Sequence, residues 1–166
     1  MNQETRMTLE VLAAFSARAC LVLLFLPFSA LDKVLNFSAA VGQAGEAARS
    51  RPLATALILA GLFVEVVMSL GVLTGIADRF AAFVLAGYCM VTALLWKPFW
   101  RKVDFRLRGP SEGRETFWDF LENFAVAGGF LALAWGGPSQ QGVAAFLADP
   151  FGSTHPYAQA IPETGR

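Results

Sequence analysis

Residues 53–76 read LATALILAGLFVEVVMSLGVLTGI, and only one of them, Glu65, carries a charge. The stretch is long enough to cross the hydrocarbon core of a bilayer, which takes about 20 mostly apolar residues. A carboxylate at the bilayer centre costs roughly 2.5–3.5 kcal/mol on insertion scales. Glu65 therefore needs either a partner of opposite charge or a function that requires the acid there.

The composition indicates a membrane protein. Hydrophobic residues make up 55 % of the 166 residues, and charged residues only 16 %. This chain is too apolar for an ordinary soluble enzyme. The formal net charge is zero, and the basic residues do not form a patch interleaved with aromatic residues. Nothing in the sequence therefore indicates a nucleic-acid partner.

Four segments are long and apolar enough to span a bilayer. They are residues 9–31, 53–76, 80–100 and 117–136. We predict an all-α, integral membrane four-helix bundle over residues 1–136, kinked at Pro27, followed by an extramembrane C-terminal tail over residues 137–166. The loop before the second span is either a short interfacial helix that Pro52 ends, or irregular.

The loops differ sharply in charge. Most Lys and Arg residues fall in the loops 32–52 and 101–116, which we therefore expect on the cytoplasmic side, with both termini outside. Trp96, Trp100 and Trp118 are then predicted to form an aromatic belt at the cytoplasmic interface, and Trp135 lies at the other interface.

A partner for Glu65 is available on the first helix. Arg18 and Glu65 lie at similar predicted depths, roughly 13–17 Å from the outer helix ends at 1.5 Å per residue. Because intramembrane ions almost always pair, we predict an Arg18–Glu65 ion pair. Two roles stay open for it: a pair that fixes helix register, or a carboxylate that accepts protons or contacts a quinone.

A second polar layer is predicted nearer the cytoplasmic interface. Lys33 closes the first helix there, and the fourth helix carries Asp119, Glu122 and Asn123 in its first two turns. We expect Lys33 to pair with Glu122 or Asp119, and Asn123 to hydrogen-bond across helices. In the alternative, the charged side chains reach the water beyond the helix ends.

The second helix carries a stripe of small residues. Gly61 and Ser69 flank Glu65 at one-turn spacing, and Gly71 and Gly75 form a G-x-x-x-G step. Such stripes allow a second backbone to approach closely. The contact is either with another helix of the same bundle or with a second copy of the chain.

The sequence predicts no cofactor or metal bound by this chain alone. Cys20 and Cys89 lie in separate apolar segments without C-x-x-C spacing, and are expected to be buried free thiols. His155, the single histidine, lies in the tail, so no pair of intramembrane histidines exists to ligate a haem.

Several motifs resemble the DoxX family of small bacterial membrane proteins. They are Arg18, the run SALDKVL around Lys33, residues 61–82, and the run ENFAVAGGFLAL that starts at Glu122. Family members often show a His-Gly step before the lysine, where this chain has Ser29-Ala30-Leu31-Asp32.

The resemblance implies a four-helix protein of the bacterial inner membrane that is associated with redox systems. The family is named after a subunit of a thiosulfate:quinone oxidoreductase. The resemblance thus favours a non-catalytic membrane subunit or anchor of a quinone-linked, sulfur-handling or oxidative-stress enzyme over an enzyme by itself. Its partners would be the lipid bilayer, a redox enzyme and a quinone, with a homo-oligomer as a further option. The alternative function is a small proton-coupled carrier that uses Glu65.

Overall fold

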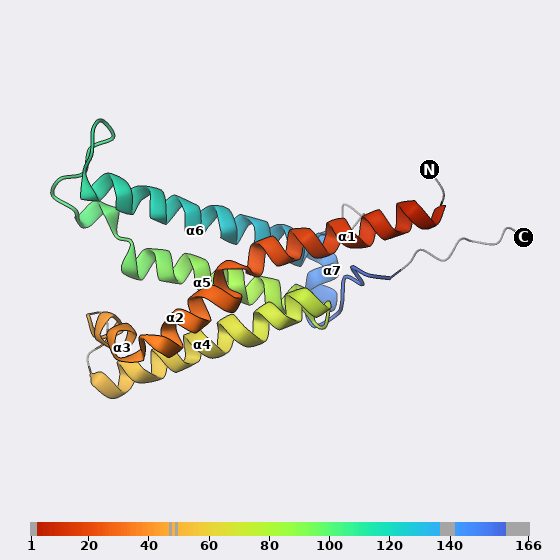
Figure 1. Cartoon of the computed structure of the whole chain (residues 1–166), viewed down its shortest axis with the longest axis horizontal. Helices are drawn as coiled ribbons and strands as arrows, with labels where there is room; N and C mark the ends of the chain where they lie inside the picture. The colour runs from red at the N-terminus through yellow and green to blue at the C-terminus, as the bar shows by residue number, and fades with distance from the viewer. Residues whose placement is uncertain (1–2, 47, 49, 137–141, 159–166) are drawn as a thin grey trace, which may run out of the picture.

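The computed structural model describes residues 3–46, 48, 50–136 and 142–158 of the chain. Within these residues every regular element is helical (Figure 1). Four helical segments are long and apolar enough to cross a membrane: Glu4–Leu35, Arg51–Thr74, Asp78–Arg101 and Glu112–Trp135. The predicted all-α membrane bundle is confirmed.

The first span is not one straight helix. It consists of α1 (Gln3–Val22), an irregular turn η1 (Leu24–Ser29) and α2 (Ala30–Leu35). Leu26 has extended backbone angles, φ −122° and ψ 109°, because the ring of a following proline disfavours the helical conformation. The predicted kink at Pro27 is confirmed as a break in the helix, and beyond it α2 packs against α4.

The segment after α2 also forms a helix. α3 (Phe37–Gly45) packs against the first turns of α4 (Arg51–Thr74) through Val41, Ala44 and Ala54. α4 begins where the Ser50 hydroxyl accepts a hydrogen bond from the Leu53 amide, with Pro52 in the first turn. Both features favour a helix start.

The central helix of the bundle is α5 (Asp78–Trp96), which packs along α4 and along α6 (Glu112–Trp135) (Figure 1). Its buried face consists largely of small residues: Ala81, Ala82, Ala86, Cys89 and Ala93. Small side chains let neighbouring helices approach closely. A short turn, η2 (Phe99–Arg101), follows α5 and leads into the connection to α6.

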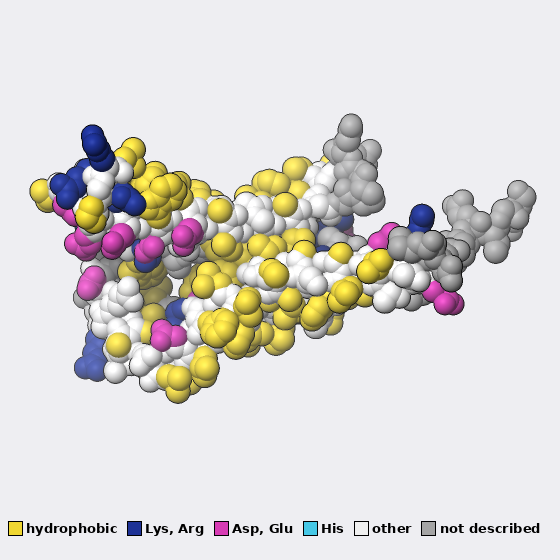
Figure 2. Space-filling view, turned by 45° about the horizontal axis from the view of Figure 1, so that its top comes forward, with side chains coloured by type: hydrophobic (Ala, Val, Ile, Leu, Met, Phe, Trp, Pro, Cys, Tyr) yellow, Lys and Arg dark blue, Asp and Glu magenta, His cyan; other side chains and the backbone are white. Residues whose placement is uncertain are grey.

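The bundle has two unlike ends. One end, here called the loop end, holds α3 and the α5–α6 connection (Figure 1). The opposite end, the terminal end, holds the start of α1, the α4–α5 turn and α7 (Gly142–Ala148). Hydrophobic side chains cover the long sides between them, whereas charged side chains gather towards the two ends (Figure 2). This distribution suits a bilayer around the middle of the bundle.

The described part of the C-terminal tail packs on the terminal end. The Phe146 ring lies 5.1 Å from the Phe83 ring, and Tyr157 donates a hydrogen bond of 2.5 Å to the Leu73 carbonyl. Residues 142–158 of the predicted extramembrane tail are thus bound to the bundle. The remainder of that tail, residues 137–141 and 159–166, lies outside the described residues.

Gly75 ends α4 in the left-handed conformation with φ +78°, and a Cβ built there would lie 2.9 Å from Cδ of Pro156. We expect Gly75→Ala to lower the free energy of unfolding by about 1–2 kcal/mol or more, because an L-residue is strained at positive φ and the proline must also move. Unfolding of the purified protein in detergent micelles measures the change.

Gly87→Ala is the matched control. Gly87 lies inside α5, and a Cβ built there would meet no neighbouring atom within 4 Å, so alanine there should be neutral or slightly stabilising. Equal losses in the two variants would contradict the role given to Gly75.

Candidate functional site

The buried charges form two separate ion pairs, and the predicted Arg18–Glu65 pair is wrong. Arg18 Nη2 lies 2.8 Å from Asp78 Oδ2, and Lys33 Nζ lies 2.7 Å from Glu65 Oε1. Arg18, Glu65 and Asp78 are all almost fully buried. Each charge is still paired, as a low-dielectric interior requires, but with a different partner.

The reason lies in the backbone at two irregular points. Arg18 Nη1 donates a hydrogen bond of 2.7 Å to the Val72 carbonyl, which lies about 10 Å farther along α4 than Glu65 at 1.5 Å per residue. The left-handed turn at Gly75 then brings Asp78 back towards Arg18. The break at Leu26 directs Lys33 to Glu65.

The Arg18–Asp78 pair is closed by the C-terminal tail. Thr154 donates from its amide to Asp78 Oδ1 (2.9 Å) and from its hydroxyl to Asp78 Oδ2 (2.5 Å). The same hydroxyl accepts a hydrogen bond of 2.8 Å from Arg18 Nη2. Both carboxylate oxygens of Asp78, the Thr154 hydroxyl and both terminal nitrogens of Arg18 are engaged within the protein, which is the arrangement of a structural element. Sequence reasoning missed Asp78 and Thr154; the only signal for Asp78 was an acid directly after the Gly75 turn.

The Glu65 site gathers three donors on one carboxylate oxygen. Lys33 Nζ donates at 2.7 Å, Tyr88 Oη at 2.9 Å and Ser29 Oγ at 3.0 Å, all to Glu65 Oε1. Lys33 also donates to Ser29 Oγ at 2.6 Å. The second oxygen, Oε2, is buried and has no hydrogen-bond partner among the described residues. This cluster therefore retains an acceptor that no described residue uses.

Gly61 makes room for the tyrosine. It lies one turn before Glu65 on α4, and a Cβ at this position would lie 3.0 Å from the Tyr88 hydroxyl. A larger residue would therefore press on the group that binds Glu65. At this point the stripe of small residues on α4 therefore packs against another helix of the same bundle.

A family model, DoxX, matches residues 13–98, which is more than half of the chain. The chain belongs to the DoxX family. The matched region contains both buried ion pairs, whereas Thr154 and all of α6 lie outside it. No curated protein and no solved structure matches the chain. Together the family and the four spanning helices make it a multi-pass membrane protein.

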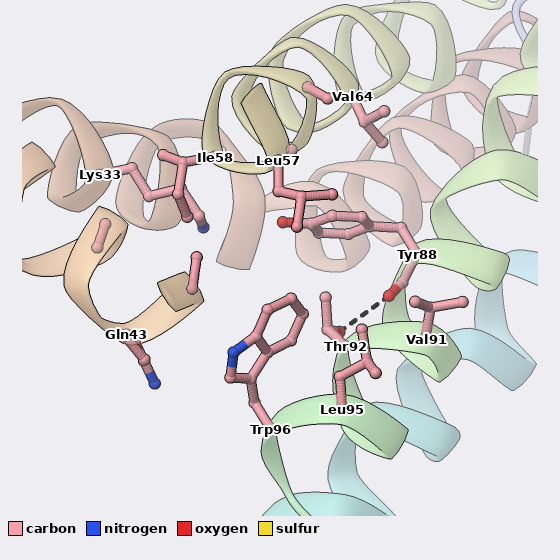
Figure 3. Close-up of a pocket in the computed structure, with 14 residues that line it drawn as sticks. Lys33, Gln43, Leu57, Ile58, Val64, Tyr88, Val91, Thr92, Leu95 and Trp96 are labelled. Carbon is pink, nitrogen blue, oxygen red and sulfur yellow. Dashed lines mark hydrogen bonds between the residues drawn. The ribbon is translucent and has the colours of Figure 1, made fainter. Parts of the chain in front are cut away.

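The Glu65 cluster of this DoxX protein borders a cavity of about 380 Å³ between α3, α4 and α5 (Figure 3). Its walls are mainly apolar and include Leu57, Ile58, Val64, Val91 and Leu95. Its polar groups come from Lys33, Gln43, Tyr88, Thr92 and Trp96. This size and this mixture of an apolar wall with few polar groups are typical of small-molecule sites.

The cavity opens towards the lipid-facing side of the bundle. Leu57, Val91 and Leu95 line it and are also exposed at the protein surface. Trp96, predicted to belong to the interfacial belt, instead lines the cavity between α3 and α5 (Figure 3). Its Nε1 is buried and has no partner in the described part of the chain.

The predicted second polar layer is wrong. Lys33 is bound to Glu65, and Asp119 instead pairs with Lys97 at 2.6 Å. Asn123 donates to the Asp119 carbonyl of its own helix, and Glu122 is exposed. The physical reason is that the break before Pro27 carries α2 towards α4, while the end of α5 brings Lys97 beside α6.

The remaining stripe residues also make contacts inside the chain. A Cβ at Gly71 would lie 3.0 Å from the Ala81 Cβ, and Gly75 lies against Pro156. Ser69 is fully buried, and its hydroxyl has no partner among the described residues. The G-x-x-x-G step is therefore used where α4 meets α5 and the tail.

Neither cysteine takes part in these sites. Both are free, and Cys89 is buried as expected, but Cys20 is exposed on α1. In the described residues no group of three or more His, Cys, Asp or Glu side chains is placed to hold a metal ion.

Lys33→Met should lower the free energy of unfolding by roughly 3–5 kcal/mol, because it leaves Glu65 buried without its cation. Adding Glu65→Gln should restore most of the loss, since the neutral amide still accepts from Tyr88. Lys97→Met is the control. Its pair with Asp119 is about half exposed and should contribute no more than about 1 kcal/mol. Unfolding in detergent tests the series, and equal losses from the two lysines would refute the buried-pair assignment.

Thr154→Val should lower the unfolding free energy by about 1–3 kcal/mol, because it removes the hydroxyl shared by Arg18 and Asp78. Thr116→Val is the matched control, since the Thr116 hydroxyl binds only the Glu112 carbonyl of its own helix. The same unfolding assay compares them. If Thr154→Val behaves like the control, the tail does not stabilise the ion pair.

Proposed function

We propose that this DoxX protein is a non-catalytic membrane subunit that binds the headgroup of a membrane quinone beside Glu65 and anchors a redox enzyme. The observation that carries the proposal is the lipid-facing cavity bordered by Lys33, Tyr88 and Trp96. The family resemblance to quinone-linked and sulfur-handling systems agrees with it. The protein would lie in a bacterial inner membrane with its loop end in the cytoplasm.

The charge of the cavity favours an uncharged ligand. Lys33 and Glu65 neutralise each other, so an anionic or cationic headgroup would compete with an existing pair. An ammonium group has three protons, and the described contacts of Lys33 use two of them, with Ser29 and Glu65. The third proton is a donor that a carbonyl oxygen of a quinone would satisfy.

The cavity walls suit a ligand that comes from the lipid phase. Apolar side chains of α4 and α5 line the rim, where they are exposed on the side that faces lipid. An isoprenoid tail would stay in the bilayer against this rim, while the headgroup occupies the polar inner part. In this proposal the chain only binds and positions the quinone headgroup. The electrons that reduce the quinone would come from the anchored enzyme.

The carrier function remains a second candidate because Glu65 Oε2 is buried without a partner among the described residues. An intramembrane acid with a free oxygen is a place where a proton could be held. Alternating access would, however, require the buried Arg18–Asp78–Thr154 cluster to open at the terminal end and to break its ion pair and hydrogen bonds. The binding subunit therefore has the stronger support.

A short-chain benzoquinone titrated into the protein in lipid nanodiscs tests quinone binding, with quenching of tryptophan fluorescence as the signal. Ala60 lines the cavity, and Ala60→Phe should weaken binding by about tenfold or more by filling it. Ala56→Phe is the matched control, an exposed alanine one turn earlier on α4 that does not line the cavity. Trp96→Phe identifies which tryptophan reports the binding.

Unchanged affinity in Ala60→Phe would contradict the cavity as the quinone site. A proton flux into proteoliposomes that Glu65→Gln abolishes, without any quinone binding, would favour the carrier instead. A redox enzyme that co-purifies from native membranes would support the anchoring role.

A further inference from the structure

The α5–α6 connection forms a cationic loop at the loop end of the bundle, defined here as residues 101–109. Asp104 fixes its shape by accepting hydrogen bonds from the Glu112 amide (2.7 Å) and the Gly113 amide (3.0 Å) at the start of α6. Arg106 donates to the Pro110 carbonyl at 2.9 Å. These contacts give the loop a defined conformation and satisfy the amides at the helix start.

Phe105 ties the loop to the bundle. Its ring lies 5.3 Å from the Phe99 ring and 5.7 Å from the Phe117 ring. Gly113 allows this approach, since a Cβ there would lie only 2.8 Å from the Phe105 Cα. The cationic loop is thus a folded surface anchored by an aromatic cluster.

The loop extends sideways from the bundle. Figure 1 shows the connection before α6 rising away from that helix, across the helix axes and at the level of its first turns. Figure 2 shows Lys and Arg side chains gathered on this projection, with hydrophobic side chains beside them and acidic ones in a separate row. Trp100 and Trp118, both exposed, lie near the same helix ends. With a bilayer around the middle of the bundle, a loop at this position would overhang the adjacent lipid.

The exposed side chains of the loop are of two kinds. Val103 and Leu107 are fully or largely exposed although the loop is anchored. Arg101, Arg106 and Arg108 are exposed too and form no ion pair with any described residue. Lys102 differs, because it is bound to Glu112, and this hydrogen bond raises the pKa of Lys102.

We propose that the cationic loop lies on the bilayer surface and binds the headgroups of anionic phospholipids. Val103 and Leu107 insert at the boundary between headgroups and acyl chains, and the arginines contact phosphate groups. Two features favour a lipid surface over an acidic protein partner: the overhang above the lipid, and the apolar side chains directly beside the cations. The proposal is independent of quinone binding.

The depth of Leu107 tests the insertion. The full-length protein with Cys20→Ser, Cys89→Ala and Leu107→Cys carries an environment-sensitive fluorophore at position 107 and is reconstituted in vesicles. We expect blue-shifted emission and quenching by brominated lipids, both stronger with phosphatidylglycerol than with phosphatidylcholine alone. Glu115→Cys, at an exposed acidic position on α6 beside the loop, should remain water-exposed.

The charge dependence tests the headgroup contact. Arg101→Gln with Arg108→Gln should raise the fraction of phosphatidylglycerol needed for half of the spectral shift, by roughly fivefold for each arginine. Arg6→Gln with Arg79→Gln removes the same charge at the terminal end and should change nothing.

Two results would overturn the proposal. Emission from position 107 that matches an aqueous site in both kinds of vesicle would rule out contact with the bilayer, and would leave an acidic protein as the alternative partner. A shift that does not depend on phosphatidylglycerol would rule out the recognition of anionic headgroups.

Discussion

The structure depends on one constraint: a charge inside the bilayer must have a partner of opposite charge within reach. The bundle meets this constraint twice, at two levels. Lys33 and Glu65 join α2 to α4, and Arg18 and Asp78 join α1 to the start of α5. Since a helix arrangement that separates these partners would leave charges buried and unpaired, the two pairs favour one arrangement of the helices over its alternatives.

The two pairs differ in their surroundings, because only one of them lies beside a cavity. Thr154 binds both Arg18 and Asp78, so this cluster is buried under the tail and borders no described cavity. Glu65 keeps an oxygen that no described residue binds, and its partners Lys33 and Tyr88 border a cavity. The second cluster is therefore the one that lies within reach of a molecule in that cavity.

The sequence was sufficient to predict the four spans, which follow from local composition. It was also sufficient to predict the break at Pro27, which follows from the geometry of proline. It also identified Arg18, Lys33 and Glu65 as residues that need partners. The assignment of partners failed, because a comparison of depths treats helices as straight rods. The extended Leu26 and the left-handed Gly75 decide which side chains meet, and neither changes the hydrophobic pattern. Nothing in the sequence indicated that Thr154 would contact the ion pair, since it reaches the bundle through tertiary packing alone.

The unlike ends of the bundle bear on where a redox partner would dock. At the terminal end, the tail covers the Arg18–Asp78 pair and the end of α4. The cavity instead extends from Tyr88 to Trp96, the last residue of α5, a distance of about 12 Å along the helix. An enzyme at the loop end would therefore lie about two helical turns from a headgroup held at Tyr88. An enzyme at the terminal end would be separated from it by the closed ion pair, so the loop end is where the proposed partner belongs.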